Sequence, residues 1–174
     1  MADTTLDGKK IVSSIGMTVA LISLAMLFAT LMMGFAVYRF TTPIWPPQGI
    51  QKPSLLLPSF STLSIFFSSM AFSRRRFFLA LFLGLMFMSF QFLFWRTLKS
   101  QGIFSTSGIF GSIIYSFTWI HAAHIIAGLC LLVWLIVKTK HPMSGLENTI
   151  SNVGKFWHFL GIIWAIMFVT IFVL

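Results

Sequence analysis

Five long apolar segments, separated by short basic or proline-containing connections, constrain this chain more than any other feature. They cover residues 11–38, 54–73, 77–95, 109–137 and 153–174. A helix needs roughly 20 predominantly apolar residues to cross the hydrocarbon core of a bilayer. The sequence therefore predicts an all-α polytopic membrane protein with five transmembrane helices. Residues 1–10 are predicted to form a polar tail ahead of a membrane domain that spans residues 11–174.

Acidic residues are absent from all five segments. The 174 residues include only three of them, with Asp3 and Asp7 in the polar tail and Glu147 in a connection. The interior therefore offers no carboxylate to carry protons or bind a cation. A stand-alone transporter is expected to show an intramembrane charge or helices broken at mid-membrane, and neither is evident. We expect a chain without a catalytic centre of its own that supports a protein complex whose reaction takes place in other chains.

Basic residues predict the orientation in the membrane. The twelve lysines and arginines, which give a formal net charge of +9, are scattered between the apolar segments and form no continuous face for nucleic acid. With the N-terminus inside, eight of them fall on the inner side and four on the outer side. Positive residues favour the inner side, so we predict N-terminus inside and C-terminus outside. The cluster Arg74-Arg75-Arg76 dominates this bias; its alternative role is a specific lipid or partner site.

Histidine is the side chain that best suits metal binding or titration within these segments. His121 and His124 lie three residues apart and share one helix face, whereas His158 follows Trp157 near the predicted inner end of the last segment. At about 1.5 Å per residue, His124 and His158 differ in depth, which disfavours haem ligation by that pair. No third metal ligand is evident. We expect neutral histidines hydrogen-bonded across helices, to the backbone or to lipid headgroups, and a helix partner for the buried Gln91.

Five motifs, taken in order, resemble one family of membrane proteins. They are residues 23–39, the loop Trp45-Pro46-Pro47-Gln48-Gly49, Leu83-Gly84 through Gln91 to Trp95, residues 117–128 around Thr118, His121 and His124, and Trp157-His158-Phe159 with Trp164. Together they resemble subunit III of the haem-copper oxidases, which include cytochrome c oxidase, in its short five-helix bacterial form. The proline-containing loop is predicted to lie on the outer side.

Three positions depart from the family pattern. Leu24 and Phe94 stand where the family usually has a glutamate, and Gly161 stands where it has an aspartate. These replacements account for the acid-free interior. They put in doubt any role that depends on the carboxylates, but not the fold, because an apolar residue in lipid costs less than a buried charge.

The resemblance implies a noncatalytic subunit of a bacterial cytoplasmic-membrane oxidase. Such a chain binds no haem or copper directly, since both lie in partner subunits. It docks on the catalytic subunit I and other oxidase subunits, holds phospholipids and helps to sustain turnover coupled to proton pumping. By analogy, the phospholipid cleft is expected between spans one and two and spans three to five. The residues His121, His124 and His158 are expected to form one inter-helix polar cluster.

Two alternatives stay open at this point. The chain is also compatible with a subunit III-like component of a quinol oxidase or a nitric oxide reductase, because donor and acceptor sites belong to other chains. The alternative of a different class is a stand-alone membrane transporter or a haem-bearing anchor. A haem-bearing anchor predicts an absorption band from the isolated chain.

Overall fold

The computed structural model describes residues 2–42, 55–106, 108–140 and 145–173. Within these ranges the chain is helical, with no strand. The elements are α1 (Ala2–Thr41), α2 (Leu56–Ser73), α3 (Phe77–Ser100), α4 (Ile109–Thr139) and α5 (Leu146–Phe168), which continues as the π-helical η1 (Val169–Val173). Five helices are long and apolar enough to cross a membrane. The prediction of an all-α polytopic membrane protein with five such helices is confirmed.

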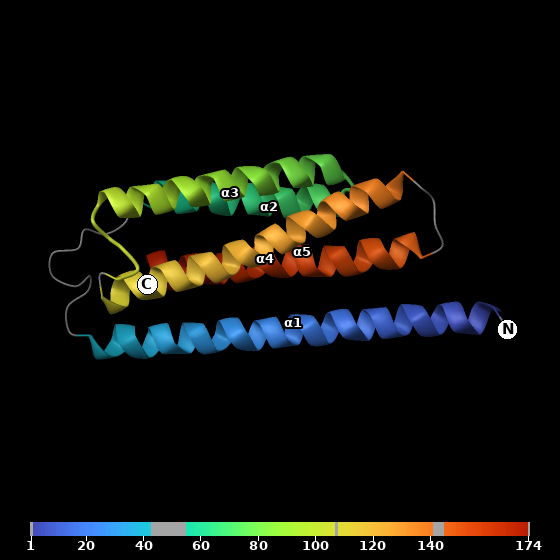
Figure 1. Ribbon diagram of the computed structural model, residues 1–174, viewed down its shortest axis with the longest axis horizontal. Coiled ribbons are helices and arrows are strands. Elements are labelled where there is room, and N and C mark those ends of the chain that lie inside the picture. Colours follow the sequence, from blue (N-terminus) through green and yellow to red (C-terminus); the bar gives the residue numbers. More distant parts are fainter. Residues whose placement is uncertain (1, 43–54, 107, 141–144, 174) are drawn as a thin grey trace.

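The helices lie nearly parallel or antiparallel to one another, with α4 and α5 between α1 and the α2–α3 hairpin (Figure 1). The N-terminus, the α2–α3 connection, the end of α4 and the start of α5 lie at one end of the bundle, called here the N-terminal end. The C-terminus lies at the opposite end, called here the C-terminal end. Basic residues predicted to face inside thus gather at one end of the molecule.

Helix α1 contributes little to the core. Among its side chains that the structure describes, only Phe28 and Phe35 are buried. These two lie seven residues apart, which is about two helical turns and places them on one face. The Phe35 ring packs edge to face against Phe117 of α4, at a centroid distance of 6.3 Å. The rest of α1 is largely exposed, as expected for a helix facing lipid.

Of the helix pairs that the structure describes, α2 and α3 make the most extensive contact. Two α2 hydroxyls donate to backbone carbonyl oxygens of α3, Ser64 to Leu83 at 2.8 Å and Ser68 to Ala80 at 2.6 Å. Small hydroxyl side chains allow helix backbones to approach closely in a membrane. The expected grouping of the first two spans against the other three is therefore wrong: α2 packs with α3 and α5, whereas α1 packs against α5 and, through Phe28 and Phe35, against α4.

Two helix starts differ most from the ranges predicted from the sequence. Helix α1 begins at Ala2, inside the predicted polar tail. Helix α5 begins at Leu146, about two turns before the predicted start at 153, so Glu147 lies in its first helical turn and not in a loop. Gly145, with φ of 88°, provides the left-handed residue before it. The first turns of α5 are amphipathic, because Asn152 and Val153 are buried while Glu147 and Ser151 are exposed.

The proline-containing loop lies outside the described residues. This applies to Trp45, Pro46, Pro47 and Gly49, so their predicted place on the outer side stays a prediction.

Candidate functional site

Trp157 is the point where four helices meet. Its side chain is fully buried on α5, and its indole N–H donates to Ser68 Oγ on α2 at 3.2 Å. The ring fills the space left by two glycines: a Cβ on Gly84 of α3 or Gly128 of α4 would lie 2.9 Å from ring carbons. Only glycine permits this approach, so the three residues fix how α3, α4 and α5 pack.

His158 lies beside the last turns of α2. Its ring hydrogen-bonds to Ser69 through Nδ1 and lies 3.3 Å from the Ser73 hydroxyl through Nε2. The edge of the ring packs against Phe72, with centroids 5.8 Å apart. Since Ser73 is the last residue of α2, His158 belongs to the N-terminal end of the membrane-spanning bundle.

His121 lies in a different, apolar environment. Its side chain is fully buried, and neither ring nitrogen has a hydrogen-bond partner in the described part of the chain. Its ring packs against Phe28 of α1, Phe87 of α3 and Trp164 of α5, with centroid distances of 6.0, 5.9 and 5.2 Å. A buried polar group without a partner costs free energy of folding. His121 stands out in the described core because both of its ring nitrogens are in this state.

His124 and Gln91 complete the predicted polar set. His124 donates from Nδ1 to the Ile120 carbonyl oxygen of its own helix at 2.7 Å, and its ring packs on Phe28. Gln91 is buried, and its amide nitrogen has no partner among the described residues. The predicted helix partner for that nitrogen is therefore not observed.

The structure does not bring the three histidines into one cluster. His121 and His124 share contacts with Phe28, as their spacing on one helix face predicted. His158 contacts α2 instead, and it lies six residues from Trp164, which is about 9 Å along the helix axis. The expected single cluster of His121, His124 and His158 is wrong.

A polar contact that the sequence analysis missed joins α3 to α4. The Trp95 indole N–H donates to Thr118 Oγ1 at 3.0 Å, and Thr118 in turn donates to the Ile114 carbonyl oxygen at 2.8 Å. Both residues belong to the motifs that carry the family resemblance. Their common presence in those motifs was the available signal, but no spacing rule links two different helices.

The three positions with replaced carboxylates lie in apolar surroundings. Leu24 packs against the core from α1, one turn before Phe28. Phe94 is buried and packs edge to face on Phe172, with centroids 5.6 Å apart. A Cβ on Gly161 would meet only Ile65, at an ordinary 3.9 Å. No described acidic side chain stands in for the missing carboxylates at these places, since Glu147 pairs elsewhere.

The described ion pair lies at the N-terminal end of the bundle. Arg75 donates from Nη1 and Nη2 to the two carboxylate oxygens of Glu147, at 2.8 and 2.7 Å. These hydrogen bonds, followed by the charge of Glu147, raise the pKa of Arg75 above its ordinary value. The pair ties the α2–α3 connection to the start of α5. It is exposed, so water and salt weaken it.

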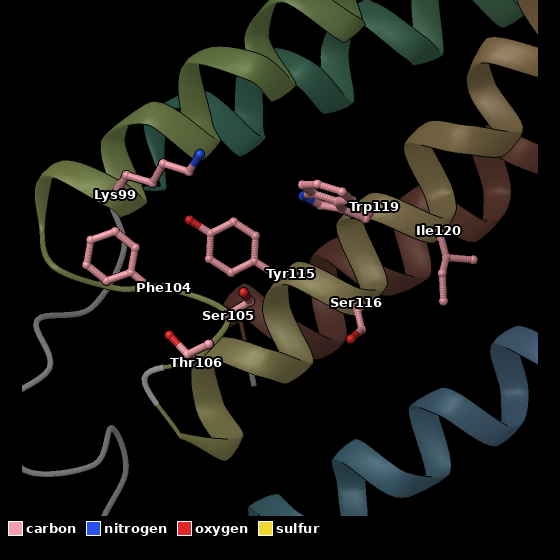
Figure 2. Close-up of a pocket in the computed structure, with 8 residues that line it drawn as sticks. All are labelled: Lys99, Phe104, Ser105, Thr106, Tyr115, Ser116, Trp119 and Ile120. Atoms are coloured by element: carbon pink, nitrogen blue, oxygen red, sulfur yellow. The ribbon is translucent and has the colours of Figure 1, made fainter.

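A hollow of about 590 Å³ opens at the C-terminal end between α3 and α4. Lys99 reaches from the end of α3 towards the space into which Tyr115 and Trp119 project from α4 (Figure 2). Tyr115 is fixed there, because its hydroxyl donates to the Ile103 carbonyl oxygen at 3.1 Å. The hollow combines one positive charge with aromatic walls.

Metal or haem ligation does not fit the side chains that the structure describes. No group of three His, Cys, Asp or Glu residues gathers among them in a way that could hold a metal ion. Three aromatic rings pack around His121, and the ring nitrogens of His158 face serine hydroxyls. An axial pair approaching one iron from opposite sides is not available from these two residues.

Comparison with known proteins identifies the family. No protein-family model matches the chain. A protein of Mycobacterium leprae named probable cytochrome c oxidase subunit 3 is 30% identical over 178 residues, which cover 91% of this chain and 86% of the relative. The chain belongs to the cytochrome c oxidase subunit III family. Membership accounts for the order of the five motifs along the chain.

Other members of the subunit III family align over a similar length at lower identity. A cytochrome c oxidase subunit 3 of Thermostichus vulcanus is 25% identical, covering 92% of this chain and 86% of the relative. One of Synechocystis sp. is 24% identical, covering 91% of this chain and 74% of the relative. The similarity is therefore spread along the whole membrane domain and is not confined to one helix pair.

Proposed function

We propose that this chain is the noncatalytic subunit III of a cytochrome c oxidase in a bacterial cytoplasmic membrane. The observation that carries the proposal is the similarity to the Mycobacterium leprae protein, which extends over 91% of this chain. The multi-pass helical fold agrees with such a subunit. In this role the chain contacts the catalytic subunit I and helps to keep it assembled and active.

The proposed role is support of turnover, without a redox centre or a proton path in this chain. Its acidic residues occur only at positions 3, 7 and 147, so the spans contain no carboxylate relay. Haem and copper belong to partner subunits in this proposal, in agreement with the poor fit of His121 and His158 to an iron. What this chain supplies is a rigid set of helices, fixed around Trp157, against which a neighbour packs.

The electron donor in this proposal is cytochrome c. The relatives' names support it over quinol, and they favour an oxygen-reducing complex over a nitric oxide reductase. Turnover measured with reduced cytochrome c and with a quinol, on the same preparation, distinguishes the donors. Activity with quinol alone would move the chain to the alternative complex.

Purification through a tag on this chain tests the proposal. In mild detergent we expect the catalytic subunit to co-purify, identified by mass spectrometry and by its haem absorption. A complex prepared without this chain is expected to start at a similar rate but to lose activity within fewer turnovers. Recovery of the chain alone from membranes that contain an active oxidase, or identical lifetimes of the two preparations, would reject the proposal.

A further inference from the structure

The three arginines of the α2–α3 connection have different surroundings. The connection is a tight helix-ending turn: the backbone N–H of Arg75 donates to the Phe72 carbonyl oxygen at 2.8 Å, and that of Arg76 to Ala71 at 2.9 Å. This pattern requires a left-handed residue, and Arg75 takes that conformation with φ of 57°. Its side chain pairs with Glu147 of α5. Arg75 therefore has a structural partner.

Arg74 and Arg76 lie on another side of the same turn. Both line a hollow of about 280 Å³ between α2 and α3. Both are exposed, and neither guanidinium has an ion-pair or hydrogen-bond partner among the described residues. The described acidic side chain at this end, Glu147, is already neutralised by Arg75. The mouth of the hollow thus carries two positive charges without a counter-charge.

The floor of the hollow is apolar and follows the helices towards mid-membrane. Its side chains come from α2 and α3 and are Phe67, Met70, Ala71, Leu79 and Leu83. On α2 they precede Arg74 at helical spacing, and on α3 they follow Arg76 at helical spacing, so two stripes converge on the arginines. The hydrogen bonds Ser64 to Leu83 and Ser68 to Ala80 hold the two helices in this relation.

We propose that this hollow binds an anionic phospholipid of the leaflet on the N-terminal side. The phosphodiester lies between Arg74 and Arg76, whose planar guanidinium groups suit phosphate oxygens. One acyl chain lies over the apolar floor. The argument is charge complementarity: two unpaired cations stand at headgroup depth directly above an apolar groove. The cluster thus has a function beyond that of an orientation signal.

Lipid selectivity in nanodiscs tests the site. The full-length chain is reconstituted in phosphatidylcholine containing chain-spin-labelled phosphatidylglycerol or, in parallel, spin-labelled phosphatidylcholine, and electron paramagnetic resonance measures the immobilised fraction. We expect a preference for phosphatidylglycerol. In the R74Q/R76Q variant the relative affinity is expected to fall about fivefold for each arginine removed, with no change for phosphatidylcholine.

A charge-matched variant separates this site from the general attraction of a basic surface. K138Q/K140Q removes the same charge at the same end of the bundle but touches no residue of the hollow, and it is expected to keep the preference. The R74K/R76K variant keeps the charge and is expected to bind. Equal losses in R74Q/R76Q and K138Q/K140Q, or an unchanged preference in R74Q/R76Q with native helicity, would overturn the proposal.

Competition by the free headgroup tests the apolar floor. Glycerophosphoglycerol, which has no acyl chains, is expected not to displace the labelled lipid; displacement at comparable concentration would contradict the proposed acyl contact. The site does not depend on the proposed oxidase function. Failure of the chain to co-purify with an oxidase would leave the lipid preference intact, and loss of the preference would leave the assembly result intact.

Discussion

Two regions of the bundle interior differ in whether their buried polar groups are hydrogen-bonded. Around Trp157 and Ser68, hydroxyl and indole groups hydrogen-bond between α2, α3 and α5. Around His121, three aromatic rings pack on a ring whose nitrogens have no partner in the described chain. Serine hydroxyls are short enough to reach a neighbouring backbone carbonyl, whereas a histidine needs a dedicated partner. In the first region, hydrogen bonds fix how the helices pack. In the second region, the polar histidine ring adds no hydrogen bond to the packing.

Replacing Trp157 with alanine should have the largest effect. Truncating a fully buried tryptophan costs about 3–5 kcal/mol, and here the ring also fills the space beside two glycines. The free energy of unfolding, measured by titrating SDS into mild-detergent micelles, is expected to fall by that amount. Trp119→Ala is the control, because this ring is 60% exposed. Equal losses of unfolding free energy in the two variants would show that the buried Trp157 ring stabilises the bundle no more than an exposed ring does.

Replacing Ser68 with alanine should have the next largest effect. The change removes the hydrogen bond to Ala80 and leaves the Trp157 indole N–H buried without a partner, at a cost of about 1–3 kcal/mol. The same SDS titration measures it. Ser89→Ala is the matched control, since that exposed hydroxyl bonds only within its own helix, to Leu85. A Ser68 variant as stable as the control would remove the proposed role of interhelical hydroxyls.

Histidine-to-leucine changes test the contrast between the two regions directly. His158→Leu breaks the contacts with Ser69 and Ser73 and is expected to lower the free energy of unfolding by about 1 kcal/mol. His121→Leu removes an unpartnered polar group and is expected to leave the protein equally or more stable. Thermal unfolding followed by circular dichroism compares the two variants. Strong destabilisation by His121→Leu would reveal a partner for its ring nitrogens.

The exposed ion pair should have the smallest effect. Arg75→Gln removes the bidentate contact with Glu147, and we expect a slight drop in melting temperature. Because salt screens exposed charges, the difference from wild type should vanish at high ionic strength. Arg74→Gln, without such a partner, is the control and is expected to leave the melting temperature unchanged at any salt concentration.

The sequence predicted the helices well because apolar length is read directly from composition. It missed the start of α5, because Glu147, Asn148 and Ser151 resemble a polar connection, while Leu146 and Ile150 pack against the core from the same turns. Polar residues in an amphipathic first turn are difficult to distinguish from a loop when the rest of the helix is uniformly apolar.

Helix partners could not be predicted from the same pattern. In a uniformly apolar span, periodicity hardly marks which face meets a neighbour, so the separation of His158 from His121 was missed. Glycine in an apolar span permits close helix approach, and Gly84 and Gly128 lie at two such approaches. That Trp157 of a third helix fills both sites depends on the rotation of α5, which no local signal encodes.

The absorption spectrum of the purified chain tests the central claim most directly. A supporting subunit without its own redox centre is expected to be colourless alone and to show haem bands only when the catalytic subunit is present. The spectrum is recorded on the chain before and after separation from its complex in detergent, with helicity checked by circular dichroism. A haem absorption band that stays with the separated chain and disappears in His121→Leu would contradict the account.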